Sequence, residues 1–279
     1  MIDLHIHGLG RWDLSQGTEE AIEEISLLYG SMGVEAFLPV IMPDKPGRVR
    51  AILGAISRVI KGHSGGAKIL GAYLEGPFLN PEYAGSLKKE YFLLPSIDAL
   101  RRLIDGFEDI VKIITIAPEL PGSLRTIEEC RRLGIKVHLG HSGATYKEAL
   151  EAKSAGATGI THLFNAMRPI HHREPGIAGF GLMDKDLYVE LICDGIHIAP
   201  EVLRLVFAVK PSDKIIAVSD AIAGELEGAS YNEEGRLRGS LYPINKAAEV
   251  LKMAGLSEEI IGMVTCENQK RYIESESGK

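Results

Sequence analysis

Short apolar runs alternate with amphipathic segments along most of the chain. Several runs are nearly continuous in Val, Ile and Leu, which is typical of strands covered on both faces of a parallel sheet. The segments between them repeat apolar residues at helical spacing, as at Ala21, Ile22, Ile25 and Leu28. The runs predict strands over residues 2–7, 36–41, 69–75, 111–117, 135–141, 158–163, 187–193 and 214–219.

Strands and helices that alternate in this way predict an α/β fold. Eight alternations in 279 residues favour a (β/α)8 TIM barrel, although an open, doubly wound sheet gives the same count. Thr145 and Glu148 form a capping box that opens a helix ending near Gly156, and Pro200 suits a first helical position. The tail over 244–272 is predicted to be helical with a break near Gly255. Residues 224–239 are polar and glycine-rich, which indicates a lid or a small hairpin. We therefore expect residues 1–279 to form one barrel domain.

Composition narrows the class of protein. The chain has 38 acidic and 31 basic residues and a net charge of −7, which argues against general binding to nucleic acid or to an anionic membrane. No apolar stretch reaches the roughly 18 residues that span a bilayer, and the amino terminus lacks the features of a signal peptide. Cys130, Cys193 and Cys266 lie far apart and form no CxxC pair, as expected of a reduced cytoplasmic protein.

Ionisable side chains gather where the predicted strands end. Residues of a strand alternate between its faces, so His5 and His7 point the same way, roughly 7 Å apart. The carboxyl ends of barrel strands form the active-site rim, and imidazoles with carboxylates are ligands for zinc, manganese or iron. One such residue alone is more often a packed core residue, but several at one rim indicate a metal site. The candidates are His5, His7, Glu75, His141, His162 and Asp220.

Two other histidines are interpreted as structural. His63 lies between glycines and serine and is expected in a loop. Counting along strand 135–141 places His138 on its outward face, so we expect it to pack beneath a helix. Neither residue adds to the predicted metal site.

The segments around the candidate ligands resemble the amidohydrolase superfamily and, more closely, its N-acetylglucosamine-6-phosphate deacetylase branch. The HxH at residues 5–7 is shared across the superfamily. The branch is marked by LEGPFLN at 74–80, GHSGAT at 140–145 and THLFNAM at 161–167, followed by HHRE at 171–174 and ICDGIH at 192–197. These segments occur in family order from residue 2 to about residue 222.

The resemblance implies a TIM barrel that removes the acetyl group from an N-acetylated amino-sugar phosphate, with N-acetylglucosamine 6-phosphate as the expected substrate. It places a principal divalent metal ion on Glu75, His141 and His162. The family binds one or two ions, and because this chain keeps the HxH, a second ion would lie on His5 and His7 with Glu75 as the bridge. Zinc is favoured over iron, manganese and cobalt.

The same resemblance assigns roles around the metal. Asp220 matches the acid/base aspartate, which takes a proton from water and passes it to the departing amine. His197 would orient the sugar or stabilise the developing oxyanion. The implied substrate contacts are Asn165, Ala166, Arg173 and His197, with Arg173 suited to the phosphate. A homodimer like that of the family would let Arg173 act across the subunit boundary.

Three features depart from the family pattern. The first strand begins at residue 2 and the chain ends soon after the last helix, so we expect a bare barrel, natural or truncated, without the family's small β-sandwich. Leu87 stands where the family has a substrate-facing histidine. The stretch after Asp220 is short, which would open the pocket.

Two other functions stay open on the sequence. The chain fits an amidohydrolase acting on N-acyl amino acids or cyclic amides, although many of those enzymes use a carboxylated lysine where this chain has Glu75. A metal-binding barrel without catalytic activity is the other alternative, and Leu87 is the residue that supports it.

Overall fold

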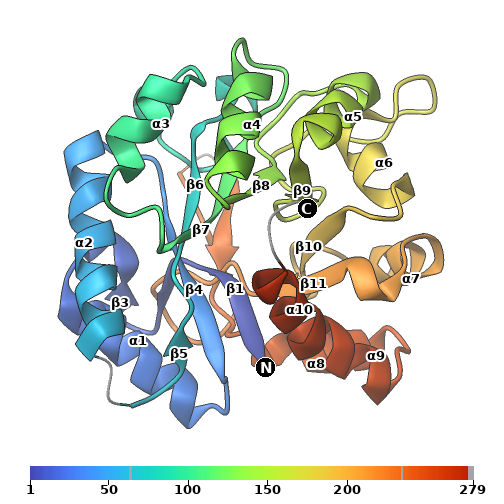
Figure 1. Ribbon diagram of the computed structural model, residues 1–279. Coiled ribbons are helices and arrows are strands. Elements are labelled where there is room, and N and C mark those ends of the chain that lie inside the picture. Colours follow the sequence, from blue (N-terminus) through green and yellow to red (C-terminus); the bar gives the residue numbers. More distant parts are fainter. Residues whose placement is uncertain (63–64, 234, 276–279) are drawn as a thin grey trace.

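Parallel strands follow one another around a barrel in the computed structural model, which describes residues 1–62, 65–233 and 235–275 (Figure 1). The prediction for His63 lies outside the described residues. A short strand, β5 (Lys68–Ile69), pairs with β4 beside the main path. The main path within the described residues runs β1 (Ile2–Ile6), β4 (Ala36–Ile41), β6 (Ala72–Phe78), β7 (Val111–Ile116), β8 (Lys136–Leu139), β9 (Ala157–Ile160), β10 (Tyr188–Ile192) and β11 (Ile215–Val218).

The first and last strands of this path lie side by side and close the barrel. The Asp220 backbone N–H donates to the His5 carbonyl at 2.9 Å, and the His7 N–H donates to the Ala221 carbonyl at 2.7 Å. Deeper in, the buried Asp3 carboxylate accepts the Ser219 backbone N–H at 3.1 Å and the Tyr29 hydroxyl at 2.6 Å. These bonds distinguish a closed barrel from an open sheet, so the predicted (β/α)8 fold is confirmed.

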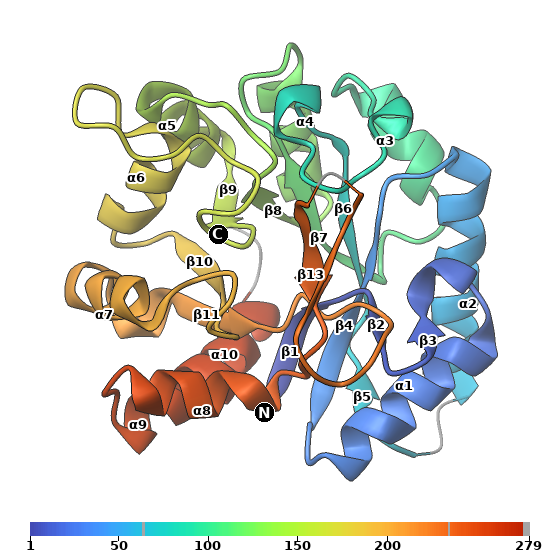
Figure 2. The same ribbon diagram turned by 180° about the vertical axis from the view of Figure 1, so that it is seen from behind.

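Helices surround the barrel in both views (Figures 1 and 2). The capping box of Thr145 and Glu148 opens α5 as predicted, and Gly156 ends it. Pro200 is the first residue of α7. The outer helices are α1 (Glu19–Ser31), α2 (Pro46–Gly62), α3 (Ile97–Ile104), α4 (Ser123–Arg132), α5 (Tyr146–Ala155), α6 (Gly176–Met183), α7 (Pro200–Val209) and α8 (Asn245–Met253). Short 3₁₀ turns occur at Leu14–Gln16, Pro81–Tyr83, Lys89–Tyr91 and Ser212–Lys214.

The two ends of the barrel are covered by different elements. The tail is helical with the predicted break at Gly255, and continues as α9 (Glu258–Gly262), a π-helical turn (Met263–Glu267) and α10 (Asn268–Glu274). Helix α10 lies toward the viewer in Figure 1, and the polar stretch at 224–239 lies toward the viewer in Figure 2. That stretch forms the predicted hairpin, β12 (Ala229–Tyr231) with β13 (Leu237–Ser240). A second small hairpin, β2 (Gly8–Leu9) with β3 (Trp12–Asp13), follows β1.

His138 points into the barrel, so the prediction of an outward position was wrong. Its side chain is fully buried, with Nε2 2.7 Å from the Tyr272 hydroxyl and Nδ1 3.0 Å from Glu190 Oε1. The alternation of faces holds only within a strand, and β8 ends at Leu139. The chain then turns at His141, where φ is 46°, so the faces cannot be counted across that turn.

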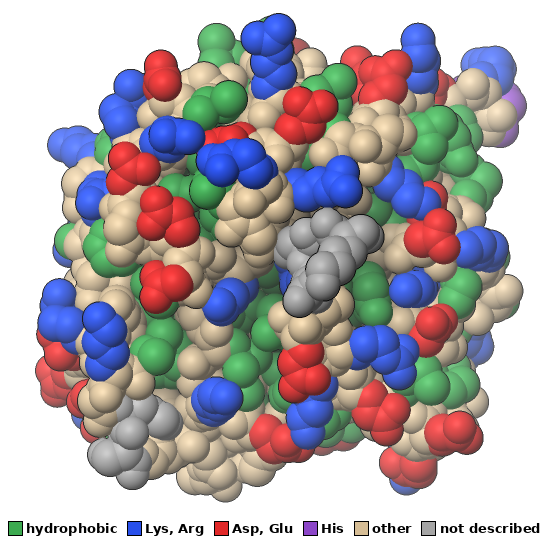
Figure 3. All heavy atoms as spheres, viewed as in Figure 1, with side chains coloured by type: hydrophobic (Ala, Val, Ile, Leu, Met, Phe, Trp, Pro, Cys, Tyr) green, Lys and Arg blue, Asp and Glu red, His purple; other side chains and the backbone are tan. Residues whose placement is uncertain are grey.

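The surface shows no segregation of charge on the face drawn in Figure 3, where acidic and basic side chains are interspersed. Among the described residues, none of the helices combines the length and the apolar character needed to cross a bilayer. The three cysteines are free thiols, with Cys130 and Cys193 buried and Cys266 partly exposed. Buried ionisable side chains gather instead inside the barrel, among them Glu75, His141 and His162.

Candidate active site

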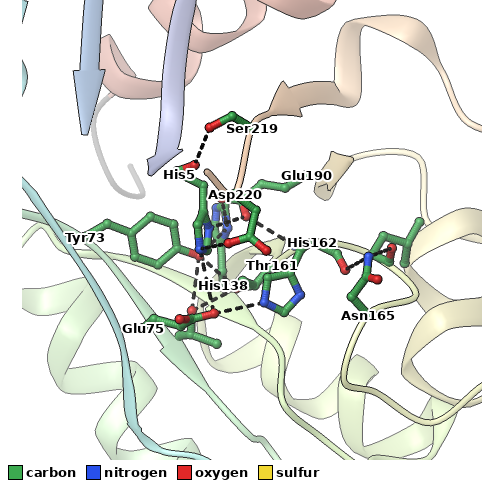
Figure 4. Close-up of polar contacts among 12 residues, drawn as sticks. His5, Tyr73, Glu75, His138, Thr161, His162, Asn165, Glu190, Ser219 and Asp220 are labelled. Atoms are coloured by element: carbon green, nitrogen blue, oxygen red, sulfur yellow. Dashed lines mark hydrogen bonds and ion pairs between the residues drawn. The ribbon is translucent and has the colours of Figure 1, made fainter. Parts of the chain in front are cut away.

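Four imidazoles converge on the carboxylate of Glu75, which is itself buried in the middle of β6, three residues before the strand ends at Phe78. The Nε2 atoms of His141 and His162 each lie 3.0 Å from Glu75 Oε1. On the other side, His7 Nε2 lies 3.4 Å from Oε2 and His5 Nε2 lies 3.7 Å from Oε1. Figure 4 shows His5, His162 and Asp220 gathered around this carboxylate. The structure therefore brings together the six residues that the strand ends predicted.

Asp220 completes the cluster from the end of β11. Its Oδ1 atom lies 3.2 Å from His7 Nε2 and 3.6 Å from His5 Nε2. The backbone at Asp220 adopts a left-handed φ of 50°, and His141 and His162 do the same at 46° and 29°. Non-glycine residues adopt this region at a cost, and such outliers collect where a site demands a particular direction of a side chain. The turns swing these side chains inward from the last residues of their strands.

The electrostatics of the cluster keep its carboxyl groups ionised. Burial by itself raises the pKa of Glu75, but hydrogen bonds from His141 and His162 hold that pKa well below its usual range. Burial likewise opposes ionisation of Asp220, and the His7 hydrogen bond with the neighbouring imidazoles lowers its pKa nonetheless. Both side chains are thus carboxylates at neutral pH, able to accept protons or bind a cation.

Two of the four imidazoles are held in orientation through Nδ1. His141 Nδ1 lies 2.9 Å from the backbone carbonyl of Tyr83, and His5 Nδ1 lies 3.1 Å from Glu190 Oε2. Burial opposes a charge on His5, but Glu190 and the two other nearby carboxylates raise its pKa to about 10. Burial also raises the pKa of Glu190, yet the electrostatic effect of the adjacent His138 and the hydrogen bonds from His138 and His5 lower that pKa to about 2.

Sequence reasoning missed two carboxylates that support the site. Glu190 stands within an otherwise apolar strand, and that exception was a usable signal because an unpartnered carboxylate is costly to bury. Glu119 accepts hydrogen bonds from the Ser142 hydroxyl at 2.7 Å and the Gly143 N–H at 2.6 Å, and so fixes the turn that carries His141. Nothing in the local pattern around Glu119 distinguishes it from a surface residue.

A cavity of about 240 Å³ opens over the cluster and contains most of the predicted substrate contacts. Asn165, Ala166 and His197 line it together with Glu75 and Asp220, and Leu87 lines it as well. The Asp194 carboxylate lies 2.7 Å from His197 Nδ1 and, against the effect of burial, raises the pKa of His197. The hairpin residues Arg236, Leu237 and Arg238 form part of the wall, and they belong to the stretch 224–239 that the sequence predicted as a lid or a small hairpin.

Arg173 is the predicted substrate contact that the structure places outside this cavity wall. It lies in an exposed segment, and its Nη1 atom is 3.0 Å from His172 Nε2. Among the described contacts, those of the Arg173 guanidinium and backbone are with His171 and His172, and none joins Arg173 to the Glu75 cluster.

The side chains fit a divalent cation at two positions. One group is His5, His7 and Glu75, the other is Glu75, His141 and His162, and the ligand atoms within each group lie within 4.8 Å of one another. His5 Nε2 is buried and has no hydrogen-bond partner among the described residues, although it faces the cluster. A cation would satisfy this orphaned atom, and mixed imidazole and carboxylate donors are suited to zinc and similar ions.

Comparison with known proteins relates the chain to deacetylases of amino-sugar phosphates. It is 31% identical to N-acetylglucosamine-6-phosphate deacetylase of Bacillus subtilis, across 98% of this chain and 74% of that relative. It is 33% identical to N-acetylgalactosamine-6-phosphate deacetylase of Escherichia coli O157:H7, across 79% of this chain and 58% of that protein. With the N-acetylglucosamine-6-phosphate deacetylase of Vibrio furnissii it shares 35% identity, over 72% of this chain and 50% of the relative. The matched part of the chain thus spans 58% and 50% of the lengths of the latter two proteins. No protein-family model matches the chain.

Solved structures give the same picture of the fold. The N-acetylglucosamine-6-phosphate deacetylase of Thermotoga maritima superposes with a TM-score of 0.89 at 29% identity, covering 98% of this chain and 77% of that one. An aspartate-to-alanine mutant of the Mycobacterium smegmatis enzyme, solved with N-acetyl-D-glucosamine-6-phosphate, matches at 26% identity with a TM-score of 0.89, over 98% of this chain and 76% of its own.

Proposed function

Because the chain belongs to the N-acetylglucosamine-6-phosphate deacetylase family, we propose that it hydrolyses the acetamide of N-acetylglucosamine 6-phosphate to glucosamine 6-phosphate and acetate. The observation that carries the proposal is the convergence of four imidazole Nε2 atoms on Glu75 beside Asp220, inside one cavity. Residues 1–279 would act as the catalytic domain. The E. coli relative named for the galactosamine epimer makes N-acetylgalactosamine 6-phosphate the second candidate substrate.

Two divalent ions are proposed, with zinc favoured over iron, manganese and cobalt. Glu75, His141 and His162 would hold the first, and His5, His7 and Glu75 the second. When bound, such an ion polarises the amide carbonyl and lowers the pKa of a water molecule. The chain itself supplies the pocket that orients the amide and excludes bulk water.

Asp220 is proposed as the general base and then the general acid. As a carboxylate it accepts a proton from the water that adds to the acetamide carbon. It returns the proton to the sugar nitrogen as the carbon–nitrogen bond breaks, so acetate and the free amine leave. His197 would orient the sugar, with Asn165 and Ala166 as further contacts on the same wall. Arg173 would bind the phosphate of a substrate held by the partner subunit in a homodimer.

Replacing Asp220 tests this assignment. We expect Asp220→Asn to lower kcat by about 10²- to 10⁴-fold, since that is the usual contribution of a positioned proton-transfer group. Released acetate would be measured for both sugar-phosphate epimers, an N-acyl amino acid and a cyclic amide, and metal content would be determined by elemental analysis.

Each outcome of this panel has a distinct meaning. Wild-type turnover of a sugar phosphate, lost in Asp220→Asn with the metal retained, would support the proposal. Equal activity in the variant would exclude the role of Asp220. Turnover of acyl amino acids or cyclic amides alone would move the chain to another amidohydrolase activity, and metal binding without any turnover would identify a non-catalytic barrel.

A further inference from the structure

Glu190 lies at the centre of the barrel, one layer below the cluster of candidate ligands. Its side chain is fully buried on β10, and it belongs to neither of the two groups able to hold a metal ion. We propose that Glu190 is a positioning residue for the His5–His7–Glu75 metal site, where it fixes the His5 ring and strengthens that imidazole as a ligand. The inference rests on the proposed metal-dependent function.

The geometry places Glu190 directly behind a ligand. Glu190 Oε2 lies 3.1 Å from His5 Nδ1, the nitrogen remote from the cluster. A proton held on Nδ1 by this carboxylate leaves Nε2 as the nitrogen that a cation would bind in place of a second proton, and Nε2 is the atom that faces Glu75 and Asp220. The same oxygen accepts the backbone N–H of His162 at 3.2 Å, so it also supports the left-handed turn there.

The carboxylate is held in place from the opposite side. Glu190 Oε1 lies 3.0 Å from His138 Nδ1, and His138 Nε2 lies 2.7 Å from the Tyr272 hydroxyl on α10. Tyr73 packs edge-on against both His5 and His138, with ring centroids 4.9 and 5.7 Å away. Figure 4 shows His138 and Glu190 beside His5. A buried acceptor clamped in this way has little freedom to release His5.

The other candidate ligands lack a comparable partner. His141 Nδ1 is bound by a neutral backbone carbonyl, that of Tyr83. The Nδ1 atoms of His7 and His162 have no hydrogen-bond partner among the described residues. A charged acceptor makes an imidazole more basic, and outer-shell partners of this kind typically change metal affinity by about 10- to 100-fold. A glutamine oxygen in place of Glu190 can still accept the His162 N–H, so we expect the loss of the Glu190 charge to act on the His5–His7 position and to spare the other.

The test is direct binding of Zn²⁺ to the metal-free chain of residues 1–279, by competition with a chelator of known affinity. His7→Ala removes a ligand of the His5–His7–Glu75 position, so the Zn²⁺ binding event that this variant loses is assigned to that position. We expect Glu190→Gln to weaken that same event by about 10- to 100-fold, because glutamine keeps the shape and loses the charge. The other event should stay within about threefold of the parent. Glu190→Asp keeps the charge and should recover part of the loss.

Glu129→Gln is the matched control, since it makes the same change at a carboxylate of α4 that pairs with Arg101 and Arg132 and belongs to neither metal group. It should leave both binding events unchanged. Equal weakening of both events in Glu190→Gln, with no recovery in Glu190→Asp, would indicate a structural role and overturn the inference. Unchanged binding in both Glu190 variants would also overturn it.

The readout is independent of substrate turnover, so the inference and the proposed function can fail separately. If His7→Ala abolishes none of the Zn²⁺ binding events of the parent chain, the inference is overturned. Deacetylation that uses a single ion would still be possible in that case. If the parent binds two ions and Glu190→Gln selectively loses one, the inference holds even when no sugar phosphate is hydrolysed.

Discussion

At the scale of single residues, the site depends on where strands stop. His141, His162 and Asp220 each follow the last residue of a strand and each adopt a positive φ. A left-handed backbone costs an L-residue about 1 kcal/mol or more, so the surrounding bonds must hold it. Glu119 holds the turn at Ser142, and Glu190 holds the backbone of His162. The ligand directions are therefore set by carboxylates that never reach the cavity.

Leu87 is the residue at which substrate binding departs from the family pattern. It lines the cavity with Glu75 and His141, where a histidine would donate a hydrogen bond to the sugar. We expect Leu87→His to raise kcat/KM for N-acetylglucosamine 6-phosphate about 2- to 10-fold, the equivalent of one neutral hydrogen bond. Steady-state assays would measure it.

A suitable control is Leu94→His, which places the same side chain at a leucine that is 67% exposed and outside the cavity. It should leave kcat/KM unchanged. No gain in Leu87→His, or an equal gain in the control, would show that the missing histidine does not limit binding.

The sequence predicted which ionisable side chains meet where the strands end. It failed for a side chain whose direction depends on the turn that follows the strand. His5 and His7 share one strand register, and their common direction is a local property. The inward position of His138 depends on the break between Leu139 and His141, which alternation cannot detect. The contacts of Glu190 with His5 and His162 link residues far apart in the chain, so periodicity contains no trace of them.

At the scale of elements, a lysine side chain from the end of α7 caps the carboxyl end of α6. Lys210, the residue after α7, is buried, and its Nζ atom donates to the carbonyls of Gly181 at 2.9 Å and Asp184 at 2.5 Å. These carbonyls belong to the last turn of α6, where helices leave acceptors without partners and favour positive charge. Lys210 thus fastens α6 to α7 on the outside of the barrel.

We expect Lys210→Met to lower the free energy of unfolding by about 1–3 kcal/mol, since two buried carbonyls lose their donor. Burial lowers the pKa of Lys210 to about 8. Between that value and the ordinary lysine pKa of about 10.4 the unfolded chain binds more protons, so the parent gains stability as pH rises through this window. Denaturant unfolding from about pH 7 to pH 10 would measure both effects.

In the same series, Lys185→Met is the control, because its Nζ atom reaches only the Val209 carbonyl on the exposed surface. Its unfolding free energy should stay within about 0.5 kcal/mol of the parent. Equal stability of parent and Lys210→Met throughout the pH range would contradict the capping role.

At the scale of the whole molecule, alternation predicted the order of strands, while closure required contacts that only the fold brings together. Asp3 and Ser219 lie far apart in the sequence, yet the Ser219 hydroxyl donates to the Asp3 carboxylate at 2.5 Å. An open sheet with the same strands would leave Asp3 buried without this partner. The count of strands alone could not decide between the two, and the contacts of the buried Asp3 with Ser219 became visible only in the structure.

The exposed position of Arg173 bears on assembly. We expect the chain to form a homodimer of twice 30.3 kDa by light scattering, with Arg173 reaching the partner's cavity. Arg173→Ala should then raise KM for the sugar phosphate about 10- to 100-fold, because a charge-assisted bond to phosphate is lost. Activity on unphosphorylated N-acetylglucosamine should not change.

Arg204→Ala is a control at a half-exposed arginine of α7 that pairs with Glu201. It should alter neither KM nor the mass in solution. A monomer at the assay concentration, with KM unaffected by Arg173→Ala, would exclude the intersubunit role.

The contact between His138 and Tyr272 has a consequence for biosynthesis. Residues 2–218 contain all the strands of the barrel wall, but the floor beneath His138 is completed by a helix that begins only at Asn268. Until residues 268–274 have been synthesised and docked, the wall therefore lacks the Tyr272 hydroxyl that contacts His138 from below. We expect the interior around His138 to close to water only once α10 is in place.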